Sequence, residues 1–335
     1  SADATINSVS VGKGANSVTG NTVLGENALD ASVTGGDNTA IGFNSLTTNT
    51  SGSNNVAVGA HTLDANSTGQ NNVALGTNTL GVNTTANNNT AVGHSALKLN
   101  TTGTDNVSVG SEALDANTTA SNNTAIGRKA LGANTTGSQN VAVGANALDA
   151  NTTGLRNTGI GADSLTSNTT GESNVAVGRD SMFHNSTGSN NTAVGKDALQ
   201  NNSTASNNTA VGKSALEENT TGHSNTAVGA TALDANTTGN NNTAVGRLAL
   251  TENTTGNENV VLGSESLDAN TTGSANTALG YGSLTSNTTA SNNTAVGRSA
   301  LNANTTGANN TAVGYFSLLS NTTGGNNTAL GNGAL

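Results

Sequence analysis

The sequence predicts an all-β fold: a parallel β-solenoid, or β-roll, in which each turn has 17 residues and stacks on the next. The first observation behind this prediction is a glycine preceded by Val, Ile or Leu that recurs every 17 residues from Gly25 to Gly331, which gives about 19 turns. The second is composition: aromatic residues make up 1% of the chain, and Pro and Cys are absent. Such a chain cannot fill a wide globular core, whereas a constant repeat length is typical of solenoids.

The repeat also sets the predicted domain organisation. The interval from Gly12 to Gly25 is only 13 residues, so residues 1–24 are expected to form a shortened opening turn. Residues 25–335 are expected to form one continuous solenoid of 17-residue repeats. Neither end shows the polar cap that solenoids use to block edge pairing, so we expect either flanking domains or end-to-end stacking between subunits.

Each turn is expected to contain one strand, just before the recurring glycine. Counting that glycine as position 0, position 14 is Thr or Val, position 16 is Val, Ile or Leu, and position 15 is almost always Ala. This alternation predicts a strand rather than a helix. We place positions 14 and 16 inside the coil, together with the Leu of position 4, and Ala outside. The inverse assignment, with Ala lining a very narrow core, remains open.

The remaining positions predict corners and side-chain ladders. Glycine at positions 0 and 10 suits corners because it tolerates positive φ, although Ala86 and Ala120 show that position 10 does not strictly require it. Asn at positions 7 and 13 and Thr or Ser at position 9 recur through the repeats. Side chains stacked about 4.8 Å apart can form hydrogen-bonded ladders along the axis. The small Ala placed outside favours close approach of a second chain.

Composition and the positions of rare residues disfavour several classes of function. The net charge of −10 and only ten Lys and Arg residues disfavour nucleic-acid binding. No apolar run approaches the roughly 20 residues of a membrane-spanning helix. The four histidines occupy different positions of the repeat, so stacking cannot bring them together and we expect no metal site. The sequence shows no nucleophile elbow, phosphate loop or paired-carboxylate pattern, so we also expect no cofactor site and no catalytic residues. The chain is therefore expected not to be an enzyme.

Basic residues favour position 1, and three of them, Arg179, Lys196 and Lys213, fall in consecutive turns. Asp180 and Asp197 follow the first two directly. The column is thus either a self-neutralising solvated edge or a contact for an anion or glycan.

The unit N-T-A-V-G-x-x-A-L resembles the head repeats of trimeric autotransporter adhesins, whose S-V-A-I-G core is similar to residues 174–178 here, N-V-A-V-G. It also resembles the repeat shafts of phage tail fibres. The first resemblance implies a left-handed roll assembled as a homotrimer at a cell surface, and the second implies a place on a virion.

Together these features predict a non-enzymatic extracellular fibrous protein, secreted or displayed at the cell surface, that acts as a rigid β-solenoid rod or self-assembling filament with a structural or adhesive role. Its expected partners are copies of itself, as a homotrimer or an end-to-end filament, and host-surface or matrix ligands. Two alternatives are an ice-binding protein that uses Thr ladders and a phage tail-fibre shaft.

Overall fold

A computed structural model describes residues 3–335 and divides them into two compact units, residues 3–170 and residues 171–335. Each unit is described by itself. Both are all-β, apart from one short 3-10 turn at Ala15–Ser17 in the first.

The strands of the first unit are short and spaced by one repeat from β3 onward. They are β1 (Ala4–Ile6), β2 (Val9–Gly12), β3 (Thr22–Gly25), β4 (Thr39–Ile41), β5 (Val56–Val58), β6 (Val73–Leu75), β7 (Thr90–Val92), β8 (Val107–Val109), β9 (Thr124–Ile126), β10 (Val141–Val143) and β11 (Thr158–Ile160).

The second unit repeats the same three-residue strand in every turn. Its strands are β12 (Val175–Val177), β13 (Thr192–Val194), β14 (Thr209–Val211), β15 (Thr226–Val228), β16 (Thr243–Val245), β17 (Val260–Leu262), β18 (Thr277–Leu279), β19 (Thr294–Val296), β20 (Thr311–Val313) and β21 (Thr328–Leu330).

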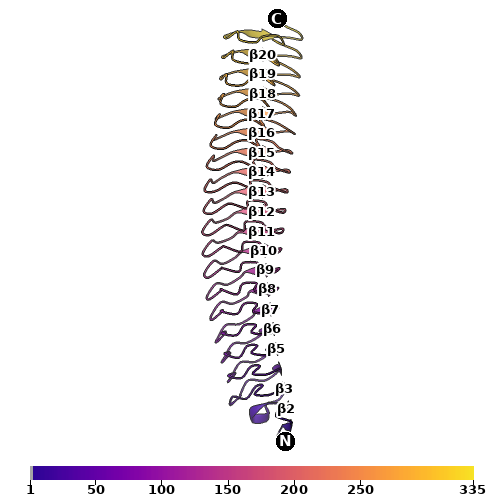
Figure 1. The fold of residues 1–335 in the computed structure, drawn as a ribbon, viewed down its shortest axis with the longest axis vertical. Helices are drawn as coiled ribbons and strands as arrows, with labels where there is room; N and C mark the ends of the chain where they lie inside the picture. Colours follow the sequence, from indigo (N-terminus) through magenta and orange to yellow (C-terminus); the bar gives the residue numbers. More distant parts are fainter. Residues whose placement is uncertain (1–2) are drawn as a thin grey trace. The chain divides into compact units, whose positions relative to one another are not determined.

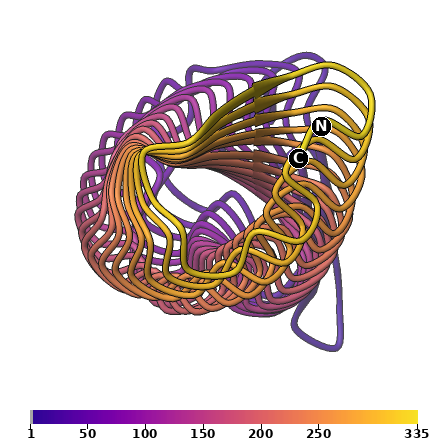
Figure 2. The ribbon, with the colours of Figure 1, turned by 90° about the horizontal axis from the view of Figure 1, so that it is seen from above.

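The predicted parallel β-solenoid with 17-residue turns is confirmed in each unit. Successive strands pair in parallel with no slip in register, so that Thr192, Thr209 and Thr226 are direct neighbours. Figure 1 shows the strands of each unit following one another turn by turn. Viewed from above, the turns of a unit trace one closed outline with their strands on the same side (Figure 2). Equivalent residues therefore form columns along each unit.

The core of each turn is narrow, and the predicted inside and outside of the strand are wrong. Ala210 and the other alanines of position 15 are fully buried, while positions 14 and 16 lie at the surface. Leu at position 4, such as Leu216, is fully buried as predicted. The Leu side chain and two inward Asn side chains leave little room on the strand side, where Ala lies in most turns and Val in two, at Val23 and Val261. The aliphatic residues of position 16 therefore point outward.

The corner at position 0 requires glycine, as predicted. From Gly42 to Gly331 these glycines have φ between 125° and 149°. A Cβ atom at Gly59 would collide with the carbonyl oxygen of Gly76 in the next turn. At position 10, by contrast, Gly52 does not adopt positive φ, and Ala86 takes the same place and is buried.

Leucine at position 4 adopts a left-handed backbone, a feature that the sequence pattern did not reveal. Leu216 has φ of 55°, and the other leucines of this column have similar values. Such φ values cost a residue other than glycine about 1 kcal/mol or more. Complete burial of the side chain offsets that cost by about 1.5–3 kcal/mol.

The predicted Asn ladders are confirmed, and both run inside the coil. At position 7, Asn66 Nδ2 donates to Asn49 Oδ1 at 2.9 Å and to the carbonyl of Gly69 at 3.1 Å. At position 13, the backbone N of Asn55 donates to Asn38 Oδ1 at 3.0 Å. All four asparagines are fully buried. The ladders therefore satisfy polar groups at the corners that water cannot reach.

The start of the first unit departs from the parallel pattern. β1 and β2 form an antiparallel hairpin, and β2 pairs antiparallel with β3. The hairpin thereby covers the edge of β3 that faces away from β4. Of the predicted opening segment, residues 1–24, Ser1 and Ala2 lie outside the described residues.

Candidate functional site

The outer face of the sheet is the most regular surface of each unit. We define it as the side chains of positions 14 and 16, which project outward from every strand from β3 to β21. Position 14 carries Thr in thirteen of these strands and Val in six, and position 16 carries Val, Ile or Leu in all of them. No charged residue occurs at either position in these strands.

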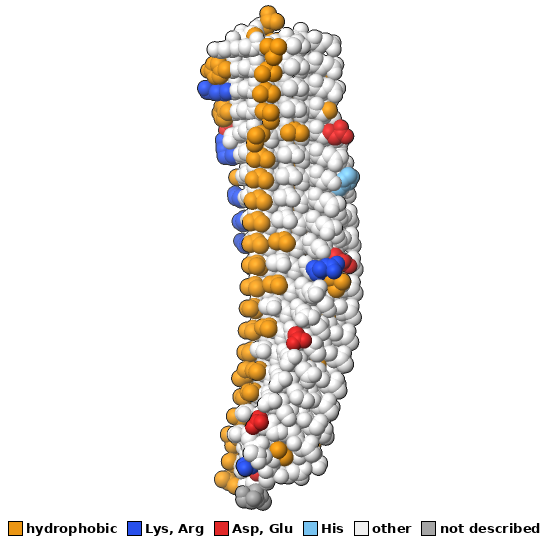
Figure 3. Space-filling view, turned by 180° about the vertical axis from the view of Figure 1, so that it is seen from behind, with side chains coloured by type: hydrophobic (Ala, Val, Ile, Leu, Met, Phe, Trp, Pro, Cys, Tyr) orange, Lys and Arg blue, Asp and Glu red, His pale blue; other side chains and the backbone are white. Residues whose placement is uncertain are grey.

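The aliphatic residues of this face are exposed or half-buried. Exposed fractions reach 45% at Leu24 in the first unit and 70% at Leu330 in the second. Hydrophobic side chains form an unbroken column along each unit (Figure 3). Single exposed aliphatic residues need no explanation, but a continuous apolar patch of several hundred Å² marks an interaction surface.

A second column, at position 1 of residues 171–335, holds all five basic residues of that unit: Arg179, Lys196, Lys213, Arg247 and Arg298. Arg179 Nε lies 3.0 Å from Asp180 Oδ2, and Lys196 Nζ lies 2.7 Å from Asp197 Oδ2. These pairs support the self-neutralising interpretation for that part of the column.

Toward its C-terminal end, the same column contains aromatic as well as basic residues. Tyr281 and Tyr315 occupy position 1 on either side of Arg298. The guanidinium carbon of Arg298 lies 5.8 Å from the centroid of each ring. Figure 3 shows hydrophobic and basic side chains alternating there, beside the aliphatic column. The recurrence of Tyr at one position could have revealed this cluster from the sequence.

Acidic residues gather at positions 5 and 6 of the second unit. Burial, followed by the carboxylates of Glu217, Glu218 and Glu252, raises the pKa of Asp234 to about 6. The Oδ1 atoms of Asp234 and Asp268 are buried without a hydrogen-bond partner. Asp268 also borders a cavity of about 190 Å³. Within residues 3–335, no group of three or more His, Cys, Asp or Glu side chains is placed to hold a metal ion.

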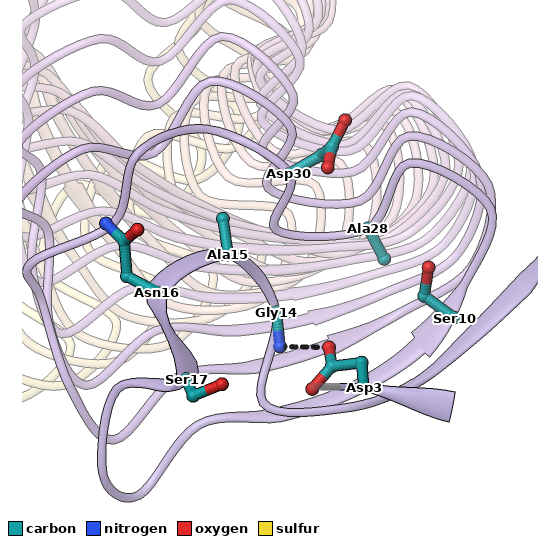
Figure 4. A pocket seen from close by; sticks show the side chains of 8 residues that line it. All are labelled: Asp3, Ser10, Gly14, Ala15, Asn16, Ser17, Ala28 and Asp30. Carbon is teal, nitrogen blue, oxygen red and sulfur yellow. Dashed lines mark hydrogen bonds between the residues drawn. The ribbon is translucent and has the colours of Figure 1, made fainter. Parts of the chain in front are cut away.

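A larger cavity, of about 350 Å³, lies at the start of the first unit and is lined by Asp3, Ser10, Asn16 and Asp30, among others (Figure 4). The Asp3 carboxylate accepts hydrogen bonds from the backbone N of Lys13 at 2.7 Å and of Gly14 at 2.6 Å. Asp3 therefore holds the loop after β2 in place.

The histidines do not add a site. His61 Nδ1 lies 3.7 Å from Asp64 Oδ2, and its ring meets the edge of Phe43 at a centroid distance of 5.3 Å. His184 makes a similar edge contact with Phe183. No helix with the length and hydropathy of a membrane span occurs in the part of the chain that the structure describes.

Comparison of the chain with known family models and with curated proteins gives no match.

Proposed function

We propose that this chain is a non-enzymatic extracellular fibrous protein whose outer sheet face packs against further copies of the same chain. The observation that carries the proposal is the face itself, which presents only Thr and aliphatic side chains over every turn of both units. A sheet face left in water would be expected to carry Lys, Glu or Asp at some of these positions.

The size of the face supports this proposal. In residues 171–335, ten strands contribute twenty outer side chains. If each exposes about 40 Å² to a partner, the face supplies about 800 Å², the area per partner of a standard protein interface. The absence of charge at positions 14 and 16 also favours self-association, because two identical faces then meet without like-charge repulsion.

The burial of position 15 changes which column of side chains supports assembly. The buried Ala column no longer argues for a second chain, since it lines the core. The hairpin β1–β2 covers the edge of β3, which disfavours end-to-end addition at that edge. Lateral packing of outer faces is therefore the mode of assembly that we propose.

Light scattering on the full chain tests the proposal, with the double variant Val211→Lys/Val245→Lys on the outer face. The wild type is expected at a multiple of 32.5 kDa and the variant at 32.5 kDa. The control Thr204→Lys/Thr238→Lys adds the same charge at exposed residues of position 9, away from the face, and is expected to keep the wild-type mass. A monomeric wild type, or an unchanged mass in the outer-face variant, would contradict lateral assembly. Compact globular particles in electron micrographs would contradict the fibrous character.

A second candidate function, ice binding, is favoured by the outward position of Thr. Thr and aliphatic residues two apart along a strand are separated by about 6.6 Å, and neighbouring strands by about 4.8 Å, which makes a regular two-dimensional array. Val replaces Thr in six strands, so the array is incomplete. Thermal hysteresis that Val211→Lys/Val245→Lys abolishes would support this candidate, and its absence at high protein concentration would remove it.

A further inference from the structure

We propose that Tyr281, Arg298 and Tyr315 form a binding site for a β-1,4-linked polysaccharide that carries carboxylate groups. This inference concerns a column next to the outer sheet face and does not depend on self-association.

The two tyrosines stand out because the chain has almost no aromatic residues. It contains two Tyr, three Phe and no Trp. Both Tyr occupy position 1 and are two turns apart, and Phe316 lies beside the second. Exposed fractions are 50% for Tyr281 and 43% for Tyr315. Exposed aromatic carbons can contact the C–H groups of a sugar ring and leave the hydroxyl groups in water.

The spacing of the rings suits one chemical class of ligand. Equivalent residues of adjacent turns are about 4.8 Å apart, so two turns separate the rings by about 10 Å. This separation is close to the length of one disaccharide in an extended β-1,4-linked glycan. Because Arg298 lies over both rings, a chain of this kind lying along the column would place every second sugar against the exposed edge of a tyrosine.

Arg298 supplies the charge selectivity between the two rings. Its guanidinium carbon is 5.8 Å from both ring centroids, within the range of cation–π contacts. Among residues 3–335, no carboxylate is recorded within ion-pair distance of Arg298, whereas Arg179, Lys196 and Arg247 each pair with one. Its N–H donors therefore remain available to a carboxylate on the sugar between the rings.

Neighbouring contacts hold the rings in place before a ligand arrives. The Tyr281 hydroxyl donates a hydrogen bond of 2.8 Å to Glu265 Oε2, and Arg247 pairs with the other oxygen of that carboxylate. The Tyr315 ring packs on Phe316 with a centroid distance of 3.9 Å. Fixed rings lose little conformational freedom on binding, which favours recognition by a small number of contacts.

The sequence supplies conservative test variants. Ser264 occupies position 1 one turn before Tyr281, so the backbone accepts serine there. We therefore choose Tyr281→Ser, Tyr315→Ser and Arg298→Gln, with Lys213→Ser as the control that removes a cation from the same column outside the cluster. Because the chain has no Trp, its intrinsic fluorescence reports on Tyr281 and Tyr315 alone.

The probes are β-1,4-linked mannuronate oligosaccharides and β-1,4-linked manno-oligosaccharides of equal length, which differ in the carboxylate. Calorimetry on the full chain should show binding of both, tighter for mannuronate, with a change in tyrosine emission. Each Tyr variant should bind both probes about tenfold more weakly. Arg298→Gln should lower the affinity for mannuronate to that for the neutral probe and leave the latter unchanged. Lys213→Ser should bind like the wild type.

Three results would overturn the proposal: no binding of either probe, wild-type affinity in both Tyr variants, or competition by polyglutamate as effective as that by mannuronate. Light scattering separates this site from the proposed assembly. The Tyr variants should keep the wild-type mass, and Val211→Lys/Val245→Lys should keep the glycan affinity.

Discussion

Positions 15 and 16 are adjacent in every strand, yet their burial is the reverse of their hydrophobicity. In β14, Ala210 is fully buried, whereas the larger and more apolar Val211 exposes 36% of its surface. The reason is the width of the coil, because Leu216 and the Asn ladders already fill most of the interior. In a thin solenoid, side-chain volume decides which strand face lies inside, and most of the larger aliphatic residues are left on the outer face.

The largest expected effect comes from placing charge on the inner side. Leu216→Asp should lower the free energy of unfolding by about 4 kcal/mol or more, since no partner inside the coil can neutralise the carboxylate. Asp tolerates the left-handed backbone of position 4, so the loss would reflect burial rather than strain. Urea unfolding and limited proteolysis measure it.

Lys213→Ser is the control for that change, because it alters an exposed residue in the same turn and should shift stability by less than about 0.5 kcal/mol. If Leu216→Asp and Lys213→Ser had the same effect on protease resistance, the assignment of inside and outside would be wrong.

Substituting Leu at position 15 and, separately, at position 16 of the same strand tests the comparison between them directly. Ala210→Leu should destabilise by about 1–3 kcal/mol because it overpacks the narrow core. Val211→Leu should be within about 0.5 kcal/mol of the wild type, since Leu75 and Leu279 occupy the same outward position in other turns. Thermal unfolding of the two variants gives the difference, and equal destabilisation by both would contradict the narrow core.

A smaller effect is expected at Asp234, which lies at the boundary between the core and the surface. Its pKa in the folded chain is about 6, above the ordinary value of 3.8, so the folded state binds the proton more tightly than the unfolded state. The resulting stabilisation is fully present below about pH 4 and is lost as the pH rises through about 6. Asp234→Asn should reduce this pH dependence.

At pH 7, Asp234→Asn should raise the free energy of unfolding by about 1 kcal/mol, a value reduced from the full pKa shift because the group is half-exposed and screened by solvent. Urea titrations at pH 4 and pH 7 measure the change, with Thr251→Ser at the same position of the next turn as the control that keeps the wild-type slope. An unchanged slope in Asp234→Asn would assign the pH dependence to other carboxylates.

Much of the architecture could be predicted from the repeat, but its cross-section could not. The constant spacing of Gly25 and its equivalents implied turns in register, and the Asn at positions 7 and 13 implied ladders. Strand alternation alone is symmetric: a three-residue segment such as Thr209–Val211 has the same pattern whichever face is inside. The recurrence of Tyr at position 1 is visible in the sequence, but the contact of Arg298 with both rings becomes visible only once the turns are stacked.

The sequence by itself thus determined the repeat length, the parallel register, the glycine corner at position 0 and the burial of Leu at position 4. Each of these follows from a residue type whose physical requirement is local or repeats in every turn. Only the tertiary structure decided that Ala lies inside, that Thr and the aliphatic residues lie outside, and that Tyr281, Arg298 and Tyr315 form one surface. These three features depend on the volume available inside a closed turn and on which residues meet across turns. A single repeat determines neither of them.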